Sequence, residues 1–179
     1  MAVEGGLPPH REPARELTEG SPVRAADSRN RIRRILLATD LAPASDNAVT
    51  WALDLASAHG AELVIISVID PDELTRDGTG VPSTRSMRWD QVRDDRQEAA
   101  QRLVARGRAA GVQASFMVWT GEPGESIVTA AASESADIVI VGSHGRSRIG
   151  RMVAGSVSDH VVRHAACPVL VVRANPEPG

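Results

Sequence analysis

Five short apolar runs separated by helix-like segments are the feature that most constrains the fold of this chain. Four of the runs are rich in Val, Ile and Leu, as expected for strands that are buried on both faces of a parallel sheet. The segments between them carry apolar residues at helical spacing, and two of them close on Gly60 and Gly111. This alternation predicts an α/β sandwich, a parallel sheet with right-handed crossovers and helices on both faces. We expect strands at 33–40, 62–69, 112–119, 137–141 and 168–172, and helices at 43–59, 88–110, 124–133 and 156–164.

Composition excludes several classes of partner and chemistry. The formal net charge is −3 with both signs scattered, so nothing indicates a surface for nucleic acid or an anionic membrane. No apolar segment approaches membrane-spanning length, and the first thirty residues lack a signal-peptide pattern, so we expect a cytoplasmic protein. All twenty basic residues are Arg, which excludes a Schiff base and a P-loop lysine.

The length of 179 residues favours one domain with tails. Residues 1–30 combine prolines, glycines and mixed charges with few large apolar groups, which predicts a disordered tail. We expect the domain to span 31–174 and a short polar tail to span 175–179. The single cysteine, Cys167, cannot form an internal disulfide, and we expect it to pack.

A glycine-rich segment follows the fourth expected strand directly. The sequence GSHGRSRIGRMVAGS, from Gly142 to Ser156, fits the pattern G-x2-G-x9-G-[ST], and a helix is expected to begin at Ser156. Glycines let main-chain N–H groups approach an anion closely, and a helix start adds unpaired donors and the positive end of the helix dipole. The pattern therefore predicts a phosphate cradle, with a flexible turn as the plainer alternative.

The segment GSHGRSRIGRMVAGSVSDHVVRHAACPVLVVR, together with Asp40 after the first strand, resembles the universal stress protein family. The resemblance covers about residues 31–174, and its glycine signature is that of the ATP-binding branch. It implies a five-stranded parallel sheet in the order 3-2-1-4-5, an adenine nucleotide alpha hydrolase-like fold, and homodimerisation through the last strand. In that order the winding reverses between the strands that end near Asp40 and Gly142, and ligands of open α/β sheets bind at such a switch point.

The same resemblance implies a set of ATP contacts. Asp40 is expected to bind the adenosine end, with Ala38 and Val68 beside adenine. Glycines, first-turn amides and hydroxyls are expected to hold ribose and phosphates, with Arg146 adding a charge-assisted contact. No side chain is assigned to catalysis or to a metal, although Mg2+ or Mn2+ is expected to bridge the phosphates. The implied contact residues are Ala38, Asp40, Val68, Val141, Gly142, Gly145, Arg146, Gly155, Ser156, Val157 and Ser158.

The chain departs from the family pattern after Asp40. Many members carry a small Gly or Ser there, whereas this chain has Leu41-Ala42-Pro43, which removes a possible hydroxyl and one backbone donor. The departure bears on affinity for the nucleotide and supports an alternative, a dimeric interaction module of the same family that binds no nucleotide. The intact glycines favour the nucleotide-binding function.

We therefore expect a nucleotide-dependent regulatory or stress-response protein. No general base can be assigned, so hydrolysis of ATP is expected to be slow at most. An adenylate-forming enzyme is disfavoured, because the SGGxDS-like loop of such enzymes is replaced here by Thr39-Asp40-Leu41-Ala42-Pro43.

The histidines and tryptophans have plainer explanations than a role in binding a metal or a base. His160 and His164 are four residues apart on a helix but lack an evident third metal ligand, so we expect surface or interface histidines. His144 lies within the glycine segment, where it is either a phosphate contact or a solvent-facing residue. Trp51 is expected on the inward face of the first helix, and Trp119 at the end of a strand.

Overall fold

The computed structural model describes residues 31–42, 45–71, 82–143 and 156–173, which form one five-stranded sheet with helices on both faces. Every neighbouring pair of strands is parallel, and the order is β3-β2-β1-β4-β5. The predicted fold class and strand order are therefore confirmed. In chain order the elements are β1 (Arg34–Ala38), α1 (Asp46–His59), β2 (Glu62–Ile69), α3 (Pro82–Ala109), β3 (Ala114–Thr120), α4 (Pro123–Ser133), β4 (Ile138–Gly142), α5 (Ser156–His164) and β5 (Val169–Val172).

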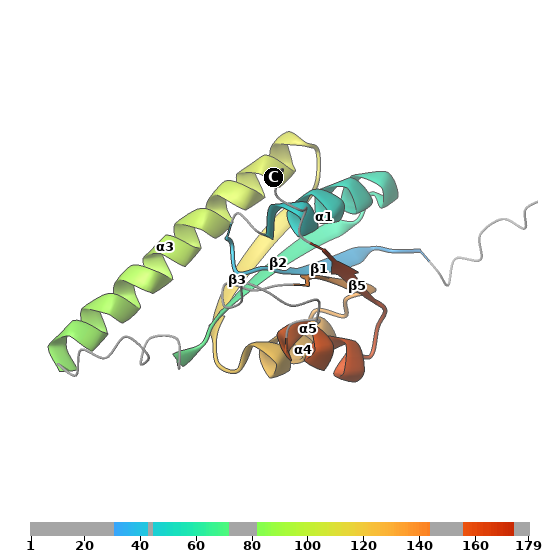
Figure 1. Cartoon of the computed structure of the whole chain (residues 1–179). Coiled ribbons are helices and arrows are strands. Elements are labelled where there is room, and N and C mark those ends of the chain that lie inside the picture. The colour runs from blue at the N-terminus through green and yellow to red at the C-terminus, as the bar shows by residue number, and fades with distance from the viewer. Residues whose placement is uncertain (1–30, 43–44, 72–81, 144–155, 174–179) are drawn as a thin grey trace, which may run out of the picture. The chain divides into compact units, whose positions relative to one another are not determined.

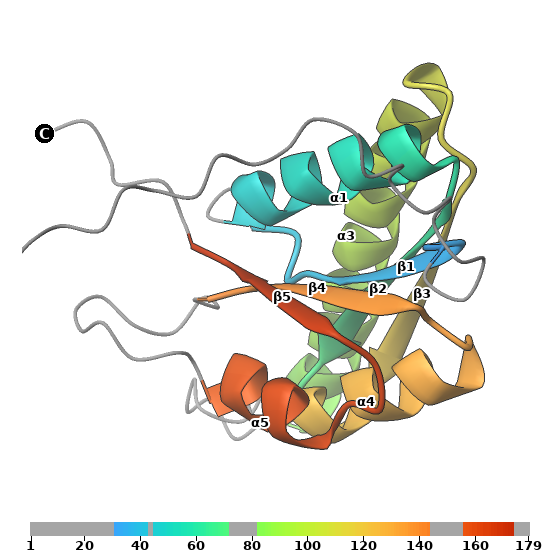
Figure 2. The same cartoon turned by 90° about the vertical axis from the view of Figure 1, so that its right-hand side faces the viewer.

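The helices cover the sheet in two layers (Figures 1 and 2), with α1 and α3 on one face and α4 and α5 on the other. Alternate residues of β1 pack against the two helical layers. Ile35 and Leu37 pack with α1 and α3, whereas Leu36 and Ala38 pack with α4 and α5. Because both faces are buried, the central strands are apolar at consecutive positions rather than at alternate ones.

Two element boundaries differ from the sequence-based expectation in ways that matter for the site. β1 ends at Ala38 instead of Asp40, so Thr39 and Asp40 belong to the turn that follows the strand. α3 begins at Pro82 rather than near residue 88. Proline is favoured in the first turn of a helix, where its missing N–H has no intrahelical acceptor, so Pro82 starts the helix instead of belonging to a loop.

The expected inward position of Trp51 is wrong, because its side chain is 52% exposed. The inward stripe of α1 consists mainly of alanine, and position 51 lies on the flank of this stripe. Trp119 and Cys167 do pack against the layer that contains α4 and α5, and burial raises the pKa of the Cys167 thiol. The buried residues of α1 are Ala48, Val49, Ala52, Leu53 and Ala56.

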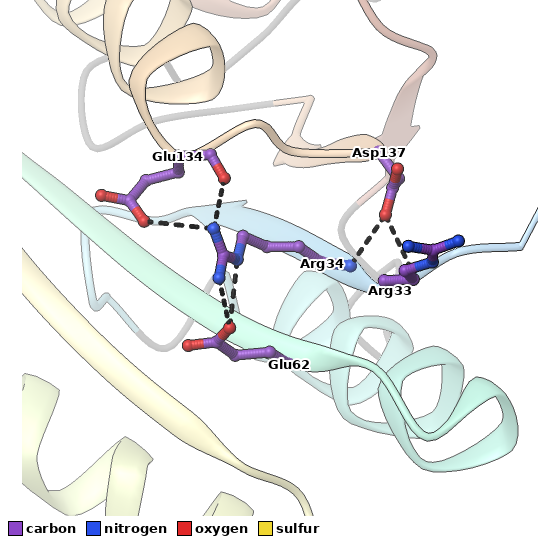
Figure 3. A network of polar contacts seen from close by, with 5 residues as sticks. All are labelled: Arg33, Arg34, Glu62, Glu134 and Asp137. Atoms are coloured by element: carbon purple, nitrogen blue, oxygen red, sulfur yellow. Dashed lines mark hydrogen bonds and ion pairs between the residues drawn. The ribbon is translucent and has the colours of Figure 1, made fainter.

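A polar network joins three strands at the amino-terminal edge of the sheet (Figure 3). The Arg34 guanidinium donates from Nε and Nη2 to Glu62 Oε2, at 3.0 and 2.8 Å, and from Nη1 to the Glu134 carbonyl oxygen at 2.7 Å. The Asp137 carboxylate accepts from the backbone N–H groups of Arg33 and Arg34, at 2.7 and 2.9 Å. Hydrogen bonding to Glu62 raises the pKa of Arg34. The network fixes the starts of β1, β2 and β4 relative to one another, at the edge opposite the candidate site.

No helix in the described part of the chain has both the length and the apolar character needed to cross a bilayer.

A close approach between α4 and α5 depends on Gly124. A Cβ at this position would lie 2.8 Å from Cγ, 2.9 Å from Cδ2 and 3.0 Å from Cβ of His160. These are atoms near the root of the histidine side chain, so relief requires a movement of α5 rather than a simple rotation of the ring. The absence of a side chain at Gly124 therefore sets how closely α5 packs.

We predict that Gly124→Ala lowers the free energy of unfolding by about 1–3 kcal/mol, because overpacking outweighs the gain in helix propensity of roughly 0.5–1 kcal/mol. Urea unfolding followed by circular dichroism measures the change. His160→Ala in the same chain should restore most of the loss, since the methyl group then has space. A Gly124→Ala variant as stable as the native chain would contradict this packing.

Candidate functional site

The centre of the sheet forms a switch point at its carboxyl edge. Ala38, the last residue of β1, pairs with Val141 of β4 on one side and with Ile66 of β2 on the other. The chain leaves β1 toward α1 on one face and later leaves β4 toward α5 on the opposite face. Connections that diverge in this way open a crevice between the strand ends, where ligands of such sheets bind.

Several of the sequence-predicted contact residues share one face of the sheet beside this crevice. Ala38 and Val141 are buried there at the ends of β1 and β4, and Val68 of β2 and Val157 of α5 pack against the same apolar layer. Gly142 ends β4 and pairs with Val172. The structure thus brings residues from β2, β1, β4 and α5 to one apolar wall next to the carboxyl edge.

Asp40 lies in a tight, hydrogen-bonded turn at this edge. Its Oδ1 atom accepts from the Ala42 backbone N–H at 3.1 Å and from Ser45 Oγ at 2.6 Å. The Leu41 N–H donates to Thr39 Oγ1 at 3.0 Å. Such side-chain-to-backbone bonds hold the turn and fix the direction of the carboxylate. The chain has no hydroxyl directly after Asp40, but the buried hydroxyl of Ser45 bonds to the Asp40 carboxylate.

Leu41 occupies the left-handed region, with a φ of 58°. This region is costly for residues with a Cβ and is most often filled by glycine or asparagine. The small residue common at this place in the resembling family would adopt the conformation at little cost. Leu41 is retained in it by its hydrogen bond to Thr39 and by partial burial against the α1 and α3 layer.

The first turn of α5 faces the crevice from the other side. The helix begins at Ser156, which is exposed, while Val157 is partly buried and Ser158 is 2% exposed. The first-turn carboxylate of Asp159 accepts from Arg163 Nε at 2.9 Å, which raises the pKa of Arg163 and offsets the negative charge near the helix start. First-turn N–H groups have no intrahelical acceptor, so this end of α5 favours an anion.

The remaining candidate residues are partly outside the described part of the chain. Gly145, Arg146, Gly155 and His144 lie outside the described residues. The His160 ring stacks on the His164 ring with centroids 4.2 Å apart, and the His160 side chain lies against Gly124 of α4. The described residues hold no group of three or more His, Cys, Asp or Glu that could bind a metal ion.

A buried polar pair near the end of β2 was missed by the sequence reasoning. Arg96 of α3, 5% exposed, donates from Nη1 to Ser67 Oγ, 1% exposed, at 2.7 Å. A signal for it exists, since Arg96 lies four residues after Val92 and four before Ala100 on the inward stripe of the helix. The bond connects the middle of α3 to the strand end.

α3 also projects beyond the sheet. At 28 residues it is about 42 Å long, whereas β2, with eight residues, spans about 26 Å. Because α3 runs antiparallel to β2, its first turns extend past the carboxyl ends of the strands (Figure 1). The Ser67–Arg96 hydrogen bond anchors this projecting helix.

The chain is therefore an α/β protein with a parallel sheet covered on both faces and a topological switch point between β1 and β4. The universal stress protein family model matches residues 31–173, and the chain belongs to this family. A universal stress protein of Thermus aquaticus is 34% identical over 143 residues, which cover 79% of this chain and 98% of the relative. The Bacillus subtilis universal stress protein YxiE is 32% identical over 145 residues, covering 78% and 98%.

Solved structures share the fold at lower identity. The Lactobacillus plantarum universal stress protein UspA superposes with a TM-score of 0.70 at 24% identity, covering 80% of this chain and 99% of that one. A universal stress protein in complex with cAMP gives a TM-score of 0.57 at 24% identity, covering 79% and 97%. One from Archaeoglobus fulgidus in complex with dAMP gives 0.58 at 18% identity, covering 79% and 98%.

The conformation of Leu41 leads to a testable difference between two substitutions. We predict that Leu41→Ile lowers the free energy of unfolding by about 1–2 kcal/mol, because a β-branched side chain is strongly disfavoured at positive φ. Leu41→Gly should stay within about 1 kcal/mol of the native value, since relief of the backbone compensates for lost packing and for the greater chain entropy of glycine. Chemical unfolding of both variants tests this, and equal stability of the two would rule out the left-handed turn.

Proposed function

We propose that this chain is an ATP-binding universal stress protein of the ATP-binding branch, in which occupancy of the crevice by ATP is the activity. In this proposal the domain spans residues 31–174. Nucleotide binding regulates the protein by changing the order of the glycine-rich segment or the contacts between two copies. The cytoplasmic location expected from the sequence stays a prediction.

One observation carries the proposal. Ala38 and Val141, both buried, and Val68, partly buried, belong to one apolar layer on one sheet face at the switch point, and the Asp40 carboxylate, held by two hydrogen bonds, lies just beyond the end of β1. An apolar wall with one oriented acceptor suits a nucleoside, whose base is flat and apolar on its faces and whose ribose carries hydroxyl donors. The complexes of two universal stress proteins with cAMP and with dAMP add support.

The phosphates are assigned to the other side of the crevice. Gly142 and the first turn of α5, with Ser156, Val157 and Ser158, flank the glycine-rich segment that carries Gly145, Arg146 and Gly155. Backbone amides and the helix dipole supply the attraction without a lysine. The described residues offer no carboxylate cluster for a cation. Mg2+ or Mn2+ would therefore be held mainly by phosphate oxygens and water, as Mg2+ commonly is.

Hydrolysis is not the main activity in this proposal. Cleavage of the terminal phosphate needs an oriented water and usually a general base. Asp40, the carboxylate nearest the switch point in the described turn, is assigned to the adenosine end and already accepts two local hydrogen bonds. We therefore expect turnover to be slow at most, and the protein to act as a sensor rather than as an enzyme.

A second candidate, an interaction module that binds no nucleotide, draws support from the turn itself. The bonds from Ala42 and Ser45 give the Asp40 carboxylate a structural role that needs no ligand. Asp40→Asn separates the two functions. The amide oxygen can still accept both local bonds, so the fold should be retained, while an adenosine contact that needs the negative charge weakens about tenfold or more.

We predict that purified protein binds ATP in the presence of Mg2+ with a stoichiometry near one per chain, measured by isothermal titration calorimetry. Gly155→Val should abolish this binding, because a branched side chain obstructs the approach of phosphate to the backbone. Gly150→Val, in the same segment but outside the glycine pattern, is the matched control and should bind nearly as well. Circular dichroism verifies that both variants are folded, and undiminished binding by Gly155→Val would refute the cradle.

We further propose a homodimer formed through the outer edge of β5, the edge strand of the sheet. Val139 donates to the Pro168 carbonyl and Ser143 to the Val172 carbonyl, so alternate residues of β5 bond inward to β4. By the two-residue period of a strand, the N–H groups of Val169 and Val171 point outward. An edge strand with outward donors is suited to pairing with a second copy.

Val171→Pro should therefore convert the dimer to a monomer in multi-angle light scattering, because proline removes an outward donor and leaves the β4–β5 ladder intact. ATP binding should be retained by the variant. A dimer that survives this substitution would argue against strand pairing at β5.

A further inference from the structure

Two large apolar side chains are notably exposed in the described part of the chain, Trp51 on α1 and Val162 on α5, each at 52%. The two helices lie on opposite faces of the sheet (Figure 2). Exposed apolar groups that share a location mark interaction surfaces more often than scattered ones do. Trp51 and Val162 share a location if both lie beside β5, the edge strand proposed to pair with a second copy.

Trp51 lies on the flank of α1 that faces β5. The opposite flank carries Leu53, whose Cδ2 atom would lie 3.4 Å from a Cβ at Gly107 of α3. One turn before Trp51, the Asn47 Nδ2 atom donates to the carbonyl oxygen of Arg173, directly after β5, at 2.6 Å. Since residues four apart share a helix face, Trp51 lies on the same flank of α1 as Asn47, the flank directed toward β5.

Val162 has the corresponding position on the other face. The flank of α5 directed toward α4 carries His160, which packs against Gly124. Val162 is two residues further along the helix and so lies on the other flank, away from α4. α5 packs beside the end strand of the sheet, so this flank faces the outer edge of β5 (Figure 2).

We infer that Trp51 and Val162 are the side-chain anchors of an interface with a second copy of this chain, one on each face of a continuous sheet. This inference rests on the β5 dimer proposed above. Antiparallel pairing of β5 with its symmetry mate requires a two-fold axis perpendicular to the sheet. Such an axis leaves the same face of both sheets pointing in the same direction. The Trp51 flanks of two α1 helices therefore meet on one side of the paired β5 strands, and the Val162 flanks of two α5 helices meet on the other side.

The size of β5 explains why such anchors are needed. The strand has four residues and offers an edge only about 13 Å long at 3.3 Å per residue. A stable interface buries roughly 800 Å² on each partner, well beyond what a short strand edge supplies. A tryptophan contributes 150–250 Å² when fully buried, and tryptophan is among the residue types enriched at binding hot spots.

Charge does not oppose this arrangement on the α5 side. The charged neighbours of Val162, Asp159 and Arg163, bond to each other at 2.9 Å, so the flank carries no net charge from them. A pair that is neutralised within one chain therefore adds no net like-charge repulsion when the same flank of a second copy approaches.

The test compares single substitutions in the full-length chain by sedimentation equilibrium. Trp51→Ala is expected to weaken the dimer by about 10- to 100-fold and Val162→Ala by a few-fold, in line with a central aromatic anchor and a smaller aliphatic one. Trp51→Glu should give a monomer. Ser57→Glu, an exposed position on the flank of α1 away from β5, is the matched control and should leave the dimer unchanged.

Three outcomes separate this inference from the proposals on which it depends. A native chain that stays monomeric at high concentration overturns both the β5 dimer and the anchors. A dimer that Val171→Pro breaks but Trp51→Glu and Val162→Glu leave intact overturns the anchors alone. Loss of dimer in Trp51→Glu, with ATP binding by calorimetry and the thermal melting of the chain unchanged, supports the anchors and excludes misfolding as the cause.

Discussion

Burial of the central strands on both faces is the constraint on which the rest of this structure depends. β1 is enclosed by β2 and β4 at its edges and by helices above and below, and Ile35, Leu36 and Leu37 are each fully buried. Burial of that much apolar surface is the main favourable contribution to folding. Because crossovers between parallel strands are right-handed, covering both faces requires the winding to reverse, which puts α1 and α3 on one face and α4 and α5 on the other and places the reversal between β1 and β4. The crevice is therefore a consequence of the way the core is covered.

The amino-terminal and carboxyl-terminal ends of the strands differ in structure. At the amino-terminal edge, Arg34, Glu62 and Asp137 hold three strand starts together through charged hydrogen bonds. At the carboxyl edge, the turn around Asp40 is built from short side-chain-to-backbone bonds, and the left-handed Leu41 is retained within it. A rigid edge opposite a turn-rich one is the usual arrangement in proteins whose loops carry function.

The proposed ligand site and the proposed dimer surface share structural elements. α5 presents its first turn to the crevice, its inward side to the sheet and its Val162 flank to the outer edge of β5. β4 likewise ends at Gly142 in the site and pairs with β5 along its length. A change at the start of α5 on nucleotide binding therefore has a short route to the β5 edge, which would suit a regulatory protein whose signal is its state of association.

Much of the fold was predictable from local pattern, because two-sided burial leaves a clear signal in sequence. The runs of β2 and the helix α5 were placed at their observed bounds, and the resemblance to the family supplied the strand order that spacing cannot give. Boundaries failed where a single residue changes the local preference, as at Pro82. The position of Trp51 failed because apolar character alone does not say which side of a helix has room for an indole.

By itself, the sequence determined the fold class, the family and the place of the glycine pattern between a strand and a helix, since these depend on local periodicity and on motif. Only the tertiary structure decided which residues share a face or an edge. The pairing of Ser67 with Arg96 and the exposed positions of Trp51 and Val162 depend on how helices and strands from distant parts of the chain pack together. Packing geometry of this kind is set by the whole core and is not encoded at any one position.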